Sequence, residues 1–416
     1  MNGEPAILGG PKAVSFDYSM LRERSGREAE RAVLAAMRQG RLSAHRISDL
    51  LAELEAGFAA RQRAKHALSF NSCTSSLFAA MFAIGLRPGD ELIVPAYGYH
   101  AAVHPILYTG AIPVFCDVEP TSFSLDTEQV VARITDRTRG IVDINMWGIP
   151  GDLRRLREIA DAHDLYLIED ASRGLGGTVG DNAIGSIGHI GCFSFSTGKV
   201  ISASEGGILV TDDDVLYSRA LSIGHPVFRE PADRQYVAFS DTALGVKHNI
   251  HPLSVCIASA KLKELQKRSL QCGENYASFL RALDGLPFLR TMKTKPADRR
   301  GAWSGIAFSY DSRALGLSTQ LFAEALRAEG CRVKMEYESN ILYRGNALRN
   351  AHLFFETPTI GPPGPFPVTE TIGKELLVAE GVVSYSIPID ELADAYGHAV
   401  EKVASAAAAI GRQYSE

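Results

Sequence analysis

The sequence has little excess charge and no long hydrophobic run. Its 43 Lys and Arg residues against 48 Asp and Glu residues give a formal net charge of −5, so no basic field indicates nucleic acid or an anionic membrane. No stretch approaches the roughly 20 apolar residues of a membrane span. The first residues, Met1 to Pro5, lack the charged start and apolar run of a secretory signal. We therefore expect no nucleic-acid partner and no membrane partner.

Cysteine is also scarce and is not paired in the sequence. The six cysteines are far apart, with no Cys-x-x-Cys pair, which argues against a disulfide framework and a zinc cage. Most of them stand among apolar or small residues, which is typical of buried free thiols. This pattern predicts a reducing compartment, the cytoplasm. The cysteines are Cys73, Cys116, Cys192, Cys256, Cys272 and Cys331.

Short apolar runs alternate with helical patterns in the first half of the 416 residues. Each run ends in small or acidic residues, and several are followed by a helical stretch. This alternation predicts an α/β domain with a mainly parallel sheet that is covered on both faces. The seven runs are 67–71, 91–96, 112–118, 140–145, 165–170, 191–196 and 207–211, and helical patterns include 74–84, 127–134 and 152–163.

The alternation of short apolar runs and helical patterns ends near Pro252. A long helical pattern runs from Ser254 to Leu283, a mixed region follows, and an Ala-rich helix is predicted from Asp390 to Gly411. We therefore expect an N-terminal arm at residues 1–29, a large α/β domain at 30–255 and a smaller α+β domain at 256–416.

Ligands of open α/β sheets bind beyond the carboxyl ends of the strands. The first such end reads Asn71-Ser72-Cys73-Thr74-Ser75-Ser76 and enters a helix predicted to start near Ser76. Its hydroxyls and free N–H groups suit an anion, although plain N-capping explains them too. The second end holds Tyr97 and Tyr99, whose rings could lie against a heterocycle or pack in the core.

Two further strand ends carry charge. Asp170 follows an apolar strand, and a buried carboxylate needs a cationic partner such as a protonated pyridine nitrogen; the alternatives are a helix cap or a salt bridge between this acidic pair and Arg173. Lys199 lies in a loop rich in hydroxyls and glycine, which suits an amine that binds an aldehyde covalently, although most single lysines lie on a surface. Together the four ends match the needs of pyridoxal phosphate.

Motifs along most of the chain resemble the DegT/StrS family of pyridoxal-phosphate-dependent sugar and cyclitol aminotransferases. The resemblance implies the fold type I architecture, with a mainly parallel seven-stranded sheet in the large domain and a smaller α+β C-terminal domain. It also implies a homodimer with shared active sites. The motifs are Gly9-Gly10-Pro11, Leu54-Glu55 with Phe58-Ala59, 89–95, 110–115, Glu169-Asp170-Ala171-Ser172, Phe193-Ser194-Phe195 with Lys199, Glu205-Gly206-Gly207 and 244–253.

By motif position, the resemblance gives each site residue a role. Lys199 would bind the cofactor covalently and move the proton, and Asp170 would pair with the ring nitrogen. Tyr99 would stack on the ring, and the phosphate would be held by Thr74, Ser75 and Ser194. Residues 247–249 would reach the cofactor or substrate of the neighbouring subunit.

Two positions depart from the family pattern. Arg173 stands where His or Gln is usual, and Lys247-His248-Asn249 stands where Asn-Tyr-Arg is frequent. Because Arg173 follows Asp170 by three positions, we expect it to reach the cofactor's phenolic oxygen or a substrate carboxylate. In the alternative, it turns away and pairs with Glu169 or a surface acid.

Other candidates concern substrate and metal. His225 could contact substrate or only hydrogen-bond within its loop, and His100 and His104, four apart on a predicted helix, have metal-ligand spacing but no third ligand. We therefore expect no metal site. The further candidates for substrate contact are His248, Asn249, Tyr337, Tyr343 and Arg344.

Three functions remain open from the sequence. The first is an aminotransferase that loads an amino group from glutamate or glutamine and delivers it to a keto-sugar, keto-cyclitol or related ketone in aminosugar or antibiotic biosynthesis. The second, suggested by Arg173, is a lyase, dehydratase or oxidative enzyme acting on an amino-acid-like substrate with the same cofactor. The third is a non-catalytic binding protein, against which Lys199 argues.

Overall fold

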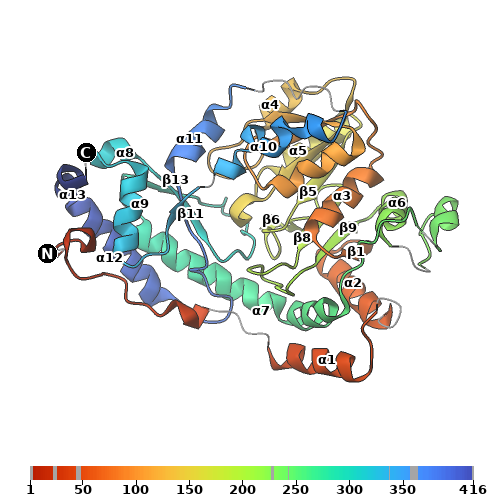
Figure 1. Cartoon of the computed structure of the whole chain (residues 1–416), viewed down its shortest axis with the longest axis horizontal. Coiled ribbons are helices and arrows are strands. Elements are labelled where there is room, and N and C mark those ends of the chain that lie inside the picture. The colour runs from red at the N-terminus through yellow and green to blue at the C-terminus, as the bar shows by residue number, and fades with distance from the viewer. Residues whose placement is uncertain are drawn as a thin grey trace.

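A seven-stranded sheet forms the centre of the large domain (Figure 1). The computed structural model describes residues 3–21, 26–43, 48–225, 229–241, 243–336, 338–356 and 364–414. The strands are β1 (His66–Phe70), β2 (Glu91–Pro95), β3 (Ile112–Cys116), β4 (Thr138–Ile144), β5 (Tyr166–Asp170), β8 (Ile190–Ser194) and β9 (Gly207–Thr211). Their order is β1-β9-β8-β5-β4-β2-β3, and only β9 runs antiparallel to its neighbours. The prediction of seven mainly parallel strands is confirmed.

Successive side chains of each strand point to opposite faces and enter two separate cores. Leu167 belongs to the core beneath α2 (Ser48–Gln62), α4 (Thr127–Ala132), α5 (Leu153–Ala162) and the first part of α7 (Pro252–Leu283). Ile168, the next residue, belongs to the core beneath α3 (Cys73–Ala83) and α6 (Asp214–Gly224). The sheet is therefore covered on both faces, as the near-continuous apolar strands indicate.

Four helices of the large domain, α3 to α6, begin at side-chain caps. Ser72 Oγ accepts a hydrogen bond from the backbone N–H of Ser75 at 3.1 Å, so α3 begins at Cys73 and not near Ser76 as expected. Asp213 caps α6 in the same way. Because α3 begins directly after β1, its first N–H groups lie at the carboxyl edge of the sheet.

A four-stranded antiparallel sheet forms the smaller domain, in the order β10-β11-β13-β12. The proposed boundary at residue 255 coincides with the first turn of α7, which passes from the large sheet to this domain (Figure 1). Its strands are β10 (Leu289–Thr291), β11 (Ile306–Tyr310), β12 (Lys334–Met335) and β13 (Leu376–Ala379), and its helices are α8 (Ser312–Leu315), α9 (Thr319–Ala328), α10 (Asn346–Arg349), α11 (Pro367–Glu375), α12 (Asp390–Ser405) and α13 (Ala407–Tyr414).

The single C-terminal helix expected from Asp390 to Gly411 is wrong. The backbone of Ala406 leaves the helical region, with φ −108° and ψ 14°, and separates α12 from α13. After this break Ile410 is fully buried. The Ala-rich sequence gives little sign of the break, since it contains neither proline nor glycine there, and the hydroxyl of Ser405 donates back to the carbonyl of Glu401 at 2.8 Å.

The N-terminal segment lies against the smaller domain. Glu329 is fully buried and accepts hydrogen bonds from the N–H groups of Ala6 (2.7 Å) and Ala13 (2.9 Å) and from Lys402 Nζ (3.0 Å). Further along, α1 (Arg27–Arg38) packs on α7. A short hairpin is formed by β6 (Thr178–Val179) and β7 (Asn182–Ala183). In the described ranges, no helix is both long and apolar enough to cross a membrane.

Candidate active site

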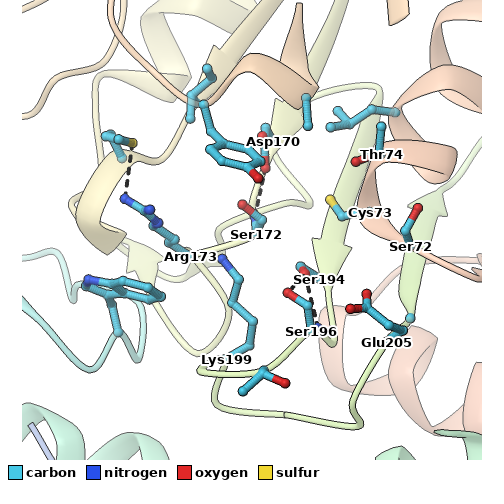
Figure 2. Close-up of a pocket in the computed structure, with 18 residues that line it drawn as sticks. Ser72, Cys73, Thr74, Asp170, Ser172, Arg173, Ser194, Ser196, Lys199 and Glu205 are labelled. Carbon is cyan, nitrogen blue, oxygen red and sulfur yellow. Dashed lines mark hydrogen bonds between the residues drawn. The ribbon is translucent and has the colours of Figure 1, made fainter. Parts of the chain in front are cut away.

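A cavity of about 370 Å³ opens at the carboxyl ends of β4, β5 and β8 (Figure 2). Parallel strands bring their ends to one edge, so residues from distant parts of the sequence meet there. Six of the residues expected from the sequence line this cavity, namely Thr74, Tyr99, Asp170, Arg173, Ser194 and Lys199.

The start of α3 forms one wall of the cavity. Ser72 and Thr74 face it (Figure 2), and the first N–H groups of a helix carry partial positive charge. Gly207 explains how β9 fits beneath this turn: a Cβ atom there would lie 2.5 Å from the backbone of Ser72 and Cys73. Ser75 does not line the cavity; its Oγ donates to Asn71 Oδ1 at 2.6 Å.

Asp170 ends β5 and is almost fully buried. Its Oδ1 accepts the backbone N–H of Ser172 at 3.0 Å. The preceding Glu169 points to the opposite face, where three backbone N–H groups donate to it, at 2.7 Å from Gly185, 2.8 Å from Ile187 and 2.5 Å from Gly188. The backbone thus satisfies the Glu169 carboxylate. The alternative in which Arg173 turns away and pairs with Glu169 is wrong.

Lys199 lies in the connection between β8 and β9 and is partly buried. Its Nζ lies 5.0 Å from the centre of the Trp303 ring. Burial first, and then the neighbouring Arg173 guanidinium, lower the pKa of Lys199 to about 8. A substantial fraction of this amine is therefore neutral near neutral pH, which is the form that attacks an aldehyde.

Three donors from later in the chain hold the backbone of the Lys199 loop. Tyr385 Oη donates to the carbonyl of Gly198 (3.0 Å), Arg268 Nε to that of Val200 (3.1 Å) and Lys261 Nζ to that of Ser202 (2.5 Å). The two cations are buried and stand seven residues apart on α7, on one face of the helix. Alternate carbonyls around Lys199 are thus held against α7 and the smaller domain.

Tyr99 borders the cavity and is 45% exposed. The expectation that the neighbouring His100 and His104 share one helix is wrong. They begin two separate 3₁₀ turns, η4 (His100–Ala102) and η5 (His104–Thr109), because Val103 between them has φ −118°. Their rings are 5.1 Å apart. Among the described residues, no three side chains gather as a metal site.

The expected residues after β9 lie outside the cavity lining. His248 bonds through its backbone to Asn71 (2.7 Å) and Gly224 (2.9 Å), while Lys247 is exposed. His225 is buried, with Nδ1 3.3 Å from Asn249 Nδ2. Burial lowers the pKa of His225 well below its usual value, so its ring is neutral. The 247–249 segment therefore supports the loop that enters α3.

The candidates from the smaller domain also lie outside the lining. Tyr343 and Arg344 both donate to Glu370 on α11, which directs their polar groups to that helix. Tyr337 lies outside the described residues.

Sequence reasoning missed several residues of the cavity wall. Those next to predicted site residues carry a local signal, because they stand in the same segment as Thr74, Asp170 or Lys199; Trp303 and Met146 carry none. Trp303 comes from beyond α7 and reaches Lys199 through an isolated antiparallel β-bridge. Met146 and Trp303 were missed altogether, whereas the lining residues quoted within motifs but given no role of their own are Ser72, Ser172, Ser196, Thr197 and Glu205.

Comparison with known proteins places the chain in a family. The profile of the DegT/DnrJ/EryC1/StrS aminotransferase family matches residues 24–377. The spore coat polysaccharide biosynthesis protein SpsC of Bacillus subtilis is 31% identical over 287 residues, 67% of this chain and 72% of that protein. A GDP-perosamine synthase of Caulobacter vibrioides is 38% identical over 173 residues, which span 42% of this chain and 47% of that protein.

A solved structure shows the same fold. The Escherichia coli GDP-4-keto-6-deoxy-D-mannose-3-dehydratase, solved with bound hydrated pyridoxal phosphate, superposes with a TM-score of 0.78 at 20% identity. The match covers 96% of this chain and 100% of that one. With the family profile spanning most of the sequence, the chain belongs to the DegT/DnrJ/EryC1/StrS family and is a pyridoxal-phosphate-dependent aminotransferase of fold type I.

Proposed function

We propose that this enzyme takes an amino group from glutamate or glutamine and transfers it to the ketone carbon of a sugar, cyclitol or related ring in aminosugar or antibiotic biosynthesis. The observation that carries the proposal is Lys199, a partly buried amine with a pKa lowered to about 8, in one cavity with Asp170. The names of the relatives, a polysaccharide biosynthesis protein and a GDP-perosamine synthase, support a sugar acceptor.

The residues of the cavity fit pyridoxal phosphate. Lys199 Nζ has an aromatic ring at 5.0 Å and, in the described part of the chain, no carboxylate within 4.0 Å, which leaves the amine available to an aldehyde. Thr74 and Ser194, which line the cavity, suit the phosphate together with the first N–H groups of α3. Tyr99 would lie against the ring, and Lys247 would reach the phosphate of a neighbouring subunit.

Asp170 and Lys199 divide the acid–base work. When bound, the cofactor supplies a pyridine ring that accepts the electron pair of a breaking bond at the substrate carbon. Asp170 holds a proton at the ring nitrogen by charge. Lys199 Nζ would take the proton from the donor's α-carbon and deliver it to the former aldehyde carbon on the other side of the amine nitrogen, a 1,3-shift, so the same amine would serve both halves of the reaction.

The rest of the cavity suits a polyhydroxylated acceptor. Ser172, Ser196 and Thr197 contribute hydroxyl groups, and Glu205 contributes a carboxylate. Such groups pair with sugar hydroxyls as donors and acceptors. The exposure of Tyr99 and Lys247 supports the expected homodimer, in which a second subunit would cover this side of the site. The six cysteines are all free and buried, which supports a reducing compartment such as the cytoplasm.

The test is the first half-reaction without an acceptor. Holoenzyme mixed with L-glutamate or L-glutamine should lose the visible absorbance of the cofactor aldehyde and release one equivalent of 2-oxo acid per site, then stop. Arg173 favours the second candidate, a lyase, dehydratase or oxidative reaction. Continued turnover with release of ammonia would support that alternative instead, and no response to any amino acid would contradict the proposed amino donor.

A further inference from the structure

The guanidinium of Arg173 lies in a corner formed by two tryptophans. Its Cζ is 4.2 Å from the centre of the Trp147 ring and 4.4 Å from that of Trp303. The ring centres are 6.2 Å apart and the planes make 56°, so the rings meet the cation from two directions and do not sandwich it. Aromatic rings at these distances attract a cation and shield it from water.

This corner is held firmly by its surroundings. Trp147 has a left-handed backbone, with φ 57° and ψ 14°, which is uncommon for a large residue and persists only where neighbours fix it. Its Nε1 donates to Tyr97 Oη at 2.9 Å, and its carbonyl accepts from Arg300 Nη2 at 2.6 Å. The chain thus maintains a strained residue to place an aromatic ring beside Arg173.

Arg173 has no anionic partner within the described ranges of the chain. No carboxylate oxygen lies within 4.0 Å, and its hydrogen bond goes from Nη1 to Met146 Sδ, a weak acceptor, at 3.3 Å. Burial lowers the pKa of Arg173, but an arginine stays charged in proteins. An unpaired cation in a partly buried site is unfavourable. An anion supplied by a ligand would therefore bind favourably beside Arg173.

The place of Arg173 indicates which ligand brings that anion. Figure 2 shows it beside Lys199, on the other side of the cavity from Thr74 and Ser72, where the phosphate is proposed to bind. The planar fork of a guanidinium matches a carboxylate in a bidentate pair. In an α-amino acid the carboxylate is bonded to the carbon that carries the reacting amine, so it must lie next to Lys199.

We propose that Arg173 binds the α-carboxylate of the amino-acid donor, held for this purpose by the Trp147–Trp303 corner. The proposal rests on the proposed function, because it assumes an amino-acid donor. It makes Arg173 a residue of donor specificity in the first half-reaction, with no part in recognising an acceptor that lacks a carboxylate. A neutral side chain such as glutamine at this position would have no permanent charge for such a pair.

The experiment compares donors that differ at one group. L-glutamate and its α-amide differ only in the α-carboxylate, while L-glutamate and L-glutamine differ only in the side chain. The half-reaction of holoenzyme is followed by absorbance for the parent, Arg173→Gln, Arg173→Lys and the surface control Arg155→Gln. In the parent and the control, the α-amide should need about 10- to 100-fold higher concentration than the acid.

In Arg173→Gln this preference for the acid over the α-amide should fall to near one, with Arg173→Lys between the two. The ratio between the concentrations of L-glutamate and L-glutamine that the half-reaction needs should not change. A variant that keeps the preference for the acid overturns the proposal. So does a variant in which all donors slow equally, which would assign Arg173 to the cofactor alone, or one in which only the side-chain comparison changes.

A second arm does not depend on amino transfer. Propanoate and propanamide are unreactive, and their binding to holoenzyme is measured by calorimetry. Propanoate should bind the parent more tightly than propanamide, and this difference should vanish in Arg173→Gln. If no amino acid converts the cofactor but propanoate binds through Arg173, the proposed donor is wrong and the carboxylate site stands. Equal binding of both probes to the parent refutes the site itself.

Discussion

Arg268 Nε lies 3.1 Å from the carbonyl oxygen of Val200, the residue that follows Lys199. The same guanidinium stands 5.2 Å from the centre of the Tyr385 ring, whose hydroxyl group donates to Gly198. One buried cation of α7 thus touches both the loop of the reactive lysine and the smaller-domain residue that supports it. Arg268 is therefore a positioning residue for Lys199.

Replacing Arg268 by leucine should loosen the Lys199 loop. Removing a buried hydrogen bond from a charged donor destabilises by about 1.5–3 kcal/mol, and kcat should fall more than KM changes because Lys199 loses its fixed place. Arg268→Lys should recover part of both. The exposed Arg281→Leu on the same helix is the control, with an effect within about 0.5 kcal/mol. Urea unfolding and steady-state kinetics measure the two effects; an Arg268→Leu enzyme with normal kcat would contradict the positioning role.

Lys199→Ala should remove covalent cofactor binding and turnover while the fold survives. The side chain makes few stabilising contacts, so circular dichroism and the melting temperature should stay near those of the parent. Borohydride reduction of parent holoenzyme followed by peptide mapping should place the label on Lys199. Label on another lysine would refute the assignment.

Asp170→Asn removes the charge that holds the proton at the ring nitrogen. Loss of one strong interaction of about 3–4 kcal/mol lowers the rate roughly 10²- to 10³-fold, measured as kcat of the half-reaction. The exposed Asp161→Asn on α5 is the charge-matched control and should be normal. If Asp170→Asn turns over at the parent's rate, the carboxylate is structural.

The pKa of Lys199, lowered to about 8, predicts the pH dependence of cofactor capture. The neutral amine reacts, so the rate at which apoenzyme binds pyridoxal phosphate covalently should rise with pH and level off above about pH 8. Arg173 is the second cause of this shift, so in Arg173→Gln the midpoint should move to higher pH. Stopped-flow absorbance from pH 6 to pH 10 measures both curves. An unchanged midpoint would show that the two side chains are not coupled.

Shared sites predict complementation between inactive subunits. Lys199→Ala and Lys247→Ala proteins, each inactive alone, should regain activity when mixed and allowed to exchange, because one hybrid site then contains both lysines. The control uses Lys263→Ala, a change at another exposed lysine, in place of Lys247→Ala. This variant should be active on its own, before any mixing. A fully active monomer in light scattering would exclude the shared site.

The sheet and the centre of the site were predictable because local sequence determines them. Each apolar run had to become a buried strand, and residues at or shortly after the carboxyl end of a strand had to lie near the ligand edge, which places Asp170 and Thr74. Strand alternation even predicts that Glu169 and Asp170 face opposite sides. The alternative of an ion pair between Glu169 and Arg173 could therefore have been excluded from the sequence alone.

Other parts of the site were not predictable, because tertiary contacts decide them. Arg268 and Lys261 resemble surface charges of an amphipathic helix, but their stems are buried and their nitrogens reach carbonyls of a distant loop. Trp303 has no motif, and its place depends on how the chain returns after α7. The end of α12 at Ser405 also depends on packing, since the local sequence favours continued helix.

The way the Lys199 loop is held has a consequence for the order of folding. Ser194 pairs with Gly207 in neighbouring strands, so this short loop closes early and at small entropic cost. Its final shape requires Arg268 and Lys261, which stand 68 and 59 residues from their carbonyl partners. Contacts of such separation form late. During refolding, the ability to bind pyridoxal phosphate covalently should therefore appear only after α7 has docked. The time course of cofactor absorbance then measures the rate of that last step.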